Sequence, residues 1–284
     1  MRKFISLLLA AGLALLAAPA SPAKGEEMSL MAFNVGKADC MLLRAGEQAY
    51  LIDTARGKNW ERVEEGLKAL GITRLDAVII THMDSDHVGG LKKLLKSDLT
   101  VAHLYVSPYY LDESGKGGQS PADKAVEKQD RRTEILSPGD TLPLGDGNLR
   151  VLGPLTPATD KEDNNSLILL AEAAGGRILL AGDMEFPEEA SLLSAEVIPA
   201  ADVLKVGNHG DDDATSSALL SAVRPKMALI STSTEEKDST PAGRVLKALA
   251  SFDAEVYQTQ EAEWGILVTV RDGAISAERL NALK

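Results

Sequence analysis

The chain has 284 residues, of which 44% are hydrophobic and 25% are charged. This is the composition of a folded globular protein, and it excludes an intrinsically disordered or collagen-like chain. The formal net charge is −12, and a field of that sign repels nucleic acids and anionic membrane surfaces at long range. The charge therefore disfavours nucleic acid as a partner.

The first 23 residues are typical of an export signal. Arg2 and Lys3 form a positive region, Ile5–Ala18 is mostly Leu and Ala, and Ser21-x-Ala23 matches a cleavage signal. The apolar run is shorter than the roughly 20 residues that a membrane span needs. We therefore expect residues 1–23 to be removed, no stable membrane span to remain, and the protein to be periplasmic or extracellular. An uncleaved anchor is the alternative.

Removal of Arg2 and Lys3 leaves 28 basic against 42 acidic side chains, a charge of −14 for the mature chain. Its first half alternates apolar runs with amphipathic stretches, which is typical of α/β layering. The expected strands are Ser29–Asn34, Cys40–Arg44, Ala49–Asp53, Ala77–Ile80 and Val101–Val106, and the expected helices are Trp60–Leu70 and Leu91–Lys96.

Residues 107–132 differ from their surroundings, because Gly and Pro interrupt a polar segment. We expect a long loop with one short helix near Asp123–Asp130. Long loops in compact domains are often functional, so Tyr109 and Tyr110 are candidates for contact with a substrate. The alternative is that the two rings only fix the loop in place.

The second half repeats the alternation. The expected strands are Ser166–Ala171, Arg177–Ala181, Val203–Val206, Met227–Ser231, Glu255–Tyr257 and Gly265–Val270, and the expected helices are Pro187–Ser194, Ser216–Val223 and Ala242–Phe252. No linker-like change in composition separates the halves. The pattern favours one α+β domain of four αββα layers, with two β-rich halves stacked between helices.

Four metal-competent side chains lie within six residues: His82, Asp84, Asp86 and His87. The apolar strand before them delivers His82 to the carboxyl edge of its sheet, and the others fill the loop before Gly89-Gly90. An acidic helix cap is the alternative, since Asp is favoured there. Capping explains one Asp and neither His, so we predict a metal site.

Two further residues follow apolar strands in the same way. Asp183 follows Ile178–Ala181 through Gly182, and His209 follows Val203–Val206 through Gly207-Asn208. Strand ends at one edge of a layered sheet converge, so residues far apart in sequence can form one site. We expect Asp183 and His209 to join the cluster at 82–87.

The run His-x-Asp-x-Asp-His-x-Gly-Gly at 82–90 resembles the metal motif of the metallo-β-lactamase superfamily. The Asp at the second ligand position is similar to the ComEC-like branch, as are further matches that span the mature chain. These are Phe33-Asn34-Val35-Gly36-Lys37-Ala38-Asp39, Leu51-Ile52-Asp53-Thr54, Asn164–Leu169, Leu180–Glu185 and Leu204–Gly210. The resemblance implies a metallo-β-lactamase-fold hydrolase domain over residues 24–284.

The resemblance also implies two divalent metal ions. It assigns His82 and Asp84 to the first, assigns Asp86, His87 and His209 to the second, and lets Asp183 bridge both. Asn164 or Asn165 stands where relatives place a third His ligand, and Asp53 resembles an aspartate that orients the ligand loop. The oxygen-rich first site favours Mn²⁺, and the second suits Zn²⁺.

Two close metal ions imply hydrolysis by an activated water, with Asp86 orienting the nucleophile and Asp86 and His209 as the catalytic residues. The ComEC-like resemblance implies phosphodiester or related anionic ester substrates. The alternatives are a β-lactam, lactone or thioester hydrolase and a catalytically reduced metal-binding module. Asn208 and Thr240 stand where the family pattern has histidines, and Asp211, Asp212 and Asp213 place negative charge beside the site.

Overall fold

The computed structural model describes residues 26–112, 118–127, 132–237 and 239–283. The predicted signal peptide, residues 1–23, lies outside the described residues. Among the helices within these ranges, none is long and apolar enough to cross a membrane.

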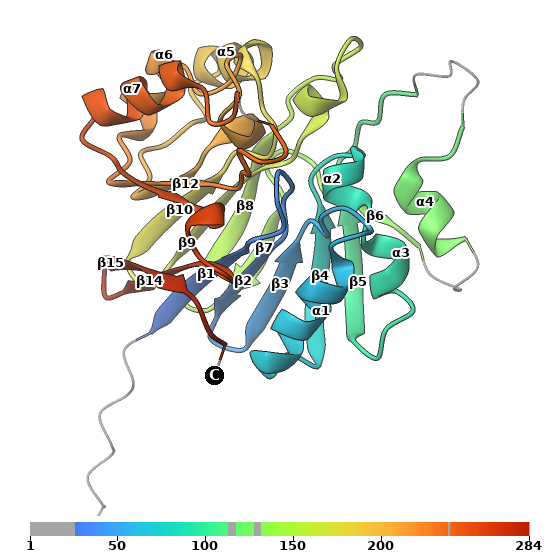
Figure 1. Ribbon diagram of the computed structural model, residues 1–284. Coiled ribbons are helices and arrows are strands. Elements are labelled where there is room, and N and C mark those ends of the chain that lie inside the picture. The colour runs from blue at the N-terminus through green and yellow to red at the C-terminus, as the bar shows by residue number, and fades with distance from the viewer. Residues whose placement is uncertain (1–25, 113–117, 128–131, 238, 284) are drawn as a thin grey trace, which may run out of the picture.

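Two β-sheets face one another, and helices cover the outer face of each (Figure 1). The first sheet has the order β15-β14-β1-β2-β3-β4-β5-β6, and the second has the order β13-β12-β11-β10-β9-β8-β7. The strands of the first sheet are β1 Glu27–Phe33, β2 Met41–Ala45, β3 Gln48–Ile52, β4 Arg74–Ile80, β5 Thr100–Val106, β6 Glu134–Ile135, β14 Gly265–Arg271 and β15 Ala274–Leu280. Those of the second are β7 Thr141–Leu144, β8 Gly147–Gly153, β9 Ile168–Ala173, β10 Gly176–Leu180, β11 Val203–Lys205, β12 Met227–Ile230 and β13 Glu255–Gln258.

The helices pack on the outer faces in two groups (Figure 1). The helices on the first sheet are α1 Trp60–Ala69, α2 Ser85–Val88, α3 Leu91–Leu94 and α4 Pro121–Val126. Those on the second sheet are α5 Phe186–Ser194, α6 Ser217–Val223 and α7 Gly243–Ser251. Short 3-10 turns lie at Glu162–Asn165, Gly207–Gly210 and Thr259–Glu261.

The alternation of side chains along each strand explains the layers. On β1, Met28, Leu30 and Ala32 lie in the core between the sheets, whereas Met31 and Phe33 lie in the core under the helices. Successive strand residues point to opposite faces, so a strand that is apolar on both faces must be covered on both. The predicted four-layered α+β fold is confirmed.

Several elements differ from the sequence prediction. Strands β6, β7, β8 and β15 were not expected, and α4 begins at Pro121, with Ser120 as its N-cap, earlier than the predicted 123. β7 contains Pro143, and β15 is exposed or half-buried along its whole length. Such strands lack the buried apolar run on which a prediction from sequence depends.

The strand directions bring the candidate ligands to one edge. β3 is parallel to β4, and β10, β11 and β12 are parallel to one another. Asp53 therefore follows β3 at the edge where His82 follows β4, and His209 follows β11 near Asp183. Asp53 and His209 have φ values of 60° and 53°, a left-handed backbone that is rare outside Gly and often found at functional sites.

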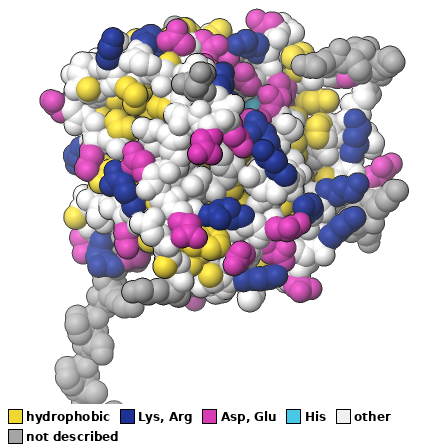
Figure 2. Space-filling model, viewed as in Figure 1, with side chains coloured by type: hydrophobic (Ala, Val, Ile, Leu, Met, Phe, Trp, Pro, Cys, Tyr) yellow, Lys and Arg dark blue, Asp and Glu magenta, His cyan; other side chains and the backbone are white. Residues whose placement is uncertain are grey.

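The surface carries both charge signs. Figure 2 shows Lys and Arg side chains interleaved with Asp and Glu over the viewed face, without one large area of a single sign. The negative net charge is therefore distributed on that face and does not form one acidic region.

Candidate metal centre

The metal-competent loop follows directly from β4. His82 and His87 are fully buried, and their ring centroids lie 4.1 Å apart. Asp84 stands at the N-cap of α2, but its side chain makes no capping hydrogen bond there. The Asp84 side chain therefore does not cap the helix, which was the alternative explanation for an aspartate at this position.

Asp183 lies between two of the imidazoles. Its Oδ2 atom is 3.2 Å from Nε2 of His87 and 3.2 Å from Nε2 of His209. Asp183 also forms a compact group of possible ligand atoms with His82 and His87. The carboxylate that was expected to bridge two metal ions thus touches both histidines of the predicted second site and lies in one group with His82 of the first.

Each of the three histidines is oriented through its Nδ1 atom. His87 Nδ1 donates to Asp53 over 2.8 Å, and His209 Nδ1 donates to the Ser231 carbonyl over 2.8 Å. His82 Nδ1 lies 3.1 Å from the Ser166 hydroxyl. A hydrogen bond at one ring nitrogen fixes the tautomer and aims the other nitrogen, which is how proteins hold metal-binding histidines.

The remaining ring nitrogens fit a metal centre. Within the described part of the chain, the buried Nε2 atoms of His82, His87 and His209 and Oδ1 of Asp183 have no hydrogen-bond partner. Buried polar atoms are normally satisfied, so four such atoms at the same place are suited to binding a cation. Imidazole and carboxylate donors suit divalent cations such as Zn²⁺ and Mn²⁺.

The ligand atoms fall into two groups. The first contains His82, Asp84 and Asp163, with His82 Nε2 lying 4.0 Å from Asp84 Oδ2 and 3.8 Å from Asp163 Oδ1. The second contains Asp86, His87 and His209. The structure therefore brings together the six residues predicted as ligands, and it adds the Asp163 carboxylate as a seventh candidate.

Asp163 is the residue that the sequence prediction missed. Asn164 and Asn165 were expected near the first metal ion, but both amides are held elsewhere. Asn164 Nδ2 donates to Glu185 over 3.1 Å, and Asn165 Nδ2 donates to Glu162 over 3.1 Å. The carboxylate beside His82 is thus Asp163, one position earlier than expected, and the two amides support neighbouring acidic side chains.

The electrostatics of the centre link Asp183 to its histidines. Burial would raise the pKa of the Asp183 carboxyl, but His209 and His87 hold that pKa well below its ordinary value. Burial would lower the pKa of His87, but Asp183 and Asp53 raise it well above its ordinary value. The buried cluster thus favours an ionised carboxylate between the imidazoles.

In the first group of ligand atoms the pKa values of the carboxyl groups are raised. Burial, together with the nearby charges of Asp183 and Asp84, raises the pKa of Asp163 to about 7. Burial and the charge of Asp86 also raise the pKa of Asp84. Crowded carboxylates repel one another unless a proton or a cation lies between them, so this group is suited to a hard divalent cation.

A buried ion pair supports the second group. Lys205 Nζ lies 2.7 Å from Asp39 Oδ2, and both side chains are fully buried. Asp39 Oδ1 lies 3.8 Å from His209 Nδ1. A lysine inside the apolar strand β11 is one signal of this pair in the sequence, but it does not indicate the partner 166 residues away.

Basic side chains line the rim of the centre. Arg56 Nη2 donates to Asp86 Oδ2 over 2.8 Å, and Lys37 Nζ lies 3.9 Å from the same atom. The three consecutive aspartates beside the site are each paired with a cation: Asp211 with Lys237, Asp212 with Arg244 and Asp213 with Lys161. The acidic run therefore presents less free negative charge than the sequence indicates.

The two tyrosines have different places. Tyr110 lines an open hollow of about 390 Å³ together with Met83 and Asp84, so it adjoins the first group of ligands. Tyr109 does not line this hollow. Glu162 joins the loop after β4 to the segment that contains the two tyrosines, because it accepts hydrogen bonds from the backbone N–H groups of Met83 and Leu111.

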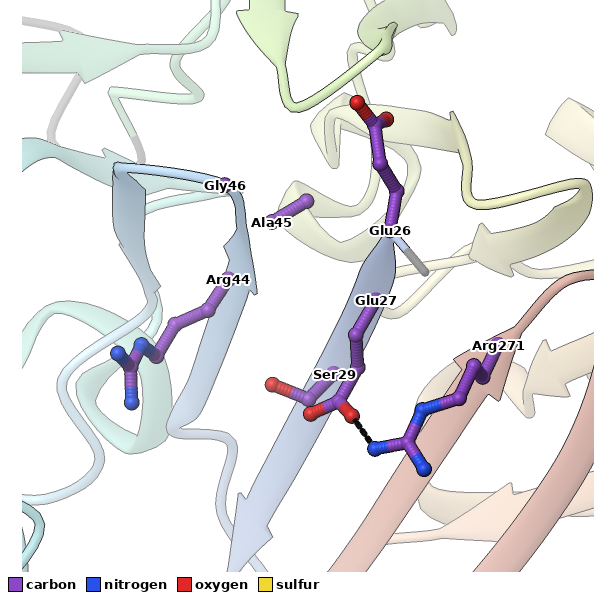
Figure 3. Close-up of a pocket in the computed structure, with 7 residues that line it drawn as sticks. All are labelled: Glu26, Glu27, Ser29, Arg44, Ala45, Gly46 and Arg271. Carbon is purple, nitrogen blue, oxygen red and sulfur yellow. Dashed lines mark hydrogen bonds and ion pairs between the residues drawn. The ribbon is translucent and has the colours of Figure 1, made fainter. Parts of the chain in front are cut away.

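Another hollow, of about 550 Å³, lies at the far edge of the first sheet between β1, β2 and β14 (Figure 3). The Glu27–Arg271 ion pair crosses it. β1 runs in the same direction as β3, because both are antiparallel to β2. Glu27, at the start of β1, is therefore at the edge opposite Asp53 and the metal centre.

Residues 33–234 match the family model of the metallo-beta-lactamase superfamily, and the chain belongs to that family. Among curated proteins it is 29% identical over 262 residues to ComE operon protein 3 of Bacillus subtilis, covering 84% of this chain and 33% of that protein. It is 27% identical over 232 residues to Recombination protein 2 of Haemophilus influenzae, covering 80% and 27%. The chain thus spans a third or less of these relatives' length, and the predicted ComEC-like relationship is confirmed.

Solved structures agree on the fold. The metallo-beta-lactamase fold protein YhfI from Bacillus subtilis aligns with a TM-score of 0.52 and 16% identity, over 86% of this chain and 99% of YhfI. CmlA, a diiron β-hydroxylase from Streptomyces venezuelae, aligns with a TM-score of 0.54 and 13% identity, over 92% and 55%. At such identities the likeness concerns the fold alone.

Proposed function

We propose that this chain is an exported hydrolase that cleaves phosphodiesters or related small anionic esters with two divalent metal ions, Zn²⁺ or Mn²⁺. The observation that carries the proposal is the set of three buried, unpartnered Nε2 atoms around Asp183. A divalent cation at this place would satisfy the imidazole nitrogens and the carboxylate at once.

We assign the candidate ligands to the two metal ions from the two groups of ligand atoms. His82, Asp84 and Asp163 would hold one ion, Asp86, His87 and His209 the other, and Asp183 both. Ions bound in this way acidify a water and polarise the scissile oxygen. The first set has one imidazole and several oxygen donors and favours Mn²⁺, whereas two imidazoles suit Zn²⁺.

The protein's own groups orient the reaction. Arg56 fixes the Asp86 carboxylate through a 2.8 Å hydrogen bond, which leaves the other oxygen of Asp86 to direct the nucleophile. Arg56 and Lys37 also place positive charge where an anionic ester approaches, and Arg recognises phosphate well. These two cations favour phosphodiesters over neutral esters.

The curated relatives support the same substrate class. The proteins named ComE operon protein 3 and Recombination protein 2 match over most of this chain, and their ComEC-like branch is the one whose motifs imply phosphodiester chemistry. The charge of −14 on the mature chain argues for small substrates over long nucleic acid. Thr240 stands in place of a family histidine. It is buried and donates to the Lys237 carbonyl, so it stabilises its own loop.

A substrate panel tests the proposal. Protein loaded with Mn²⁺ or Zn²⁺ is assayed with bis(p-nitrophenyl) phosphate, single-stranded DNA and nitrocefin. We expect turnover of the small phosphodiester exceeding that of DNA. Turnover of nitrocefin alone would favour the β-lactam, lactone or thioester alternative. No turnover at full metal occupancy would reject the hydrolase and leave a metal-binding module.

Export is tested separately. Expression of the whole chain in a bacterium, followed by mass determination of the protein from the periplasm or medium, should give a mature chain that begins at Lys24. Recovery of the uncut chain from the cytoplasm alone would contradict export.

A further inference from the structure

A carboxylate from a distant loop lies in a ring of donors at the rim of the metal centre. Glu236 Oε2 accepts hydrogen bonds from the Lys37 backbone N–H over 3.0 Å and from Arg56 Nη1 over 3.0 Å. Glu236 Oε1 accepts from Lys58 Nζ over 3.1 Å. We propose that this ring is a binding subsite for a phosphate group of the substrate, and that Glu236 occupies it until the substrate displaces the side chain.

The backbone below the carboxylate is shaped for close approach by an anion. Gly36 has a φ of +79°, and a Cβ atom at this position would lie 2.8 Å from the carboxylate of Glu236. The positive φ favours Gly here, and the nearest atoms that a Cβ would meet are at the movable end of the Glu236 side chain. Backbone N–H groups exposed beside such a turn form anion-binding concavities in many phosphate sites. The Lys37 N–H is such a donor.

Arg56 connects this ring to the metal centre. Its Nη1 atom donates to Glu236, while its Nη2 atom donates to the candidate ligand Asp86 over 2.8 Å. The Lys37 ammonium also lies 3.9 Å from Asp86 Oδ2. Only the Arg56 guanidinium would therefore lie between an anion in the ring and the reacting ester. An anionic group of the substrate at this place would contribute to substrate binding.

Glu236 is suited to be displaced. Partial burial would raise the pKa of its carboxyl, but Lys58 and the Lys37 N–H hold that pKa below its ordinary value, so the group is anionic like the proposed ligand. The side chains of Glu236, Arg56 and Lys58 are 29%, 30% and 64% exposed. Ion pairs as exposed as these contribute little to stability, so release of the side chain costs little.

Calorimetric titration of the metal-loaded protein with inorganic phosphate tests the subsite. Phosphate binding at the metal ions is common to all variants, so differences report on the ring. Glu236→Gln and Glu236→Ala should both bind phosphate roughly three- to ten-fold more tightly than the wild type, as expected when one partly exposed competitor is removed. Unchanged or weaker binding in both variants would overturn the inference.

Two controls separate local from general charge effects. Glu235→Gln removes the same charge from the neighbouring position, which is not part of the ring, and should change phosphate affinity much less. Lys58→Gln in the Glu236→Gln background should reverse most of the gain, because Lys58 is then a phosphate donor. An equal gain from Glu235→Gln, or no loss from Lys58→Gln, would contradict the subsite.

The inference rests on the proposed function for the identity of the substrate, but the two fail separately. Tighter phosphate binding by Glu236→Gln without turnover of any ester would support the subsite and reject the hydrolase. Turnover of the phosphodiester with no effect of Glu236 on phosphate affinity would retain the hydrolase and reject the subsite.

Discussion

The Asp53 carboxylate holds the His87 imidazole in place, with Oδ2 of Asp53 lying 2.8 Å from Nδ1 of His87 and both side chains fully buried. Asp53 also accepts from the Thr81 N–H and from the Thr81 hydroxyl, each over 2.8 Å. One carboxylate thus ties the end of β4 to the ligand loop and directs Nε2 of His87 toward Asp183.

Replacement of Asp53 tests this orienting role. Asp53→Ala should weaken metal affinity by about 10- to 100-fold, the range seen when a group behind a ligating histidine is removed. Asp53→Asn should have a smaller effect, because the amide keeps part of the hydrogen bonding. Chelator competition measures both affinities. The exposed Asp98→Ala is the control, and an affinity of Asp53→Ala equal to that of this control would contradict the role.

Asp183 is the residue on which both metal ions should depend. Its Oδ2 atom touches His87 and His209, and it groups with His82 as well. Asp183→Ala should therefore abolish loading of both ions, which elemental analysis of the purified protein measures. Asp183→Asn keeps the side-chain volume and should lose metal in the same way. Retention of two ions per chain in either variant would show that Asp183 does not bridge.

Metal binding should depend on pH through Asp163. The pKa of this carboxyl in the metal-free protein is raised to about 7. Below that pH the carboxyl holds a proton that a metal ion must displace, so affinity falls as pH decreases, by up to about ten-fold per pH unit for one proton. Above it the part of the dependence that Asp163 contributes should level off.

The matched variant for this prediction is Asp163→Asn. It has the same shape without a titrating group, so it should bind metal more weakly at neutral pH and lose that part of the pH dependence. Isothermal titration at several pH values between about 6 and 8 measures the slope. An identical slope in the variant would show that Asp163 is not a ligand.

The Asp39–Lys205 pair should matter for stability. Lys205→Met leaves the fully buried Asp39 charge unpaired, which should lower the free energy of unfolding by about 3–5 kcal/mol. The double variant Lys205→Met, Asp39→Asn should recover much of the loss. Urea unfolding under constant metal conditions measures these changes.

An exposed pair provides the comparison. Lys226 and Asp202 lie 2.9 Å apart with side chains 71% and 24% exposed, and Lys226→Met should cost only about 0–1 kcal/mol. A Lys205→Met variant as stable as Lys226→Met would contradict the role assigned to the buried pair.

The sequence predicted the parts of the site that local spacing determines. His82, Asp84, Asp86 and His87 lie within six residues after one strand, so their proximity follows from the strand's direction alone. Asp183 was expected because, like His209, it follows an apolar strand through a Gly. The four-layered fold followed from the alternation of apolar strands and amphipathic helices.

Other parts depend on contacts between distant segments. Which residue of the run at 163–166 faces His82 is set by the 3-10 turn Glu162–Asn165, and no periodicity reveals that Asp163 does so. Glu236 meets Arg56 across 180 positions and Lys205 meets Asp39 across 166. Such pairs arise from the packing of the two sheets, which is not visible in local sequence.

A measurement of metal content together with turnover tests hydrolysis by two metal ions most directly. Metal-free protein is titrated with Mn²⁺ or Zn²⁺, and hydrolysis of bis(p-nitrophenyl) phosphate is followed at each addition. We expect activity to increase until two ions are bound per chain and to disappear when a chelator removes them. Two bound ions per chain without release of p-nitrophenol would contradict it.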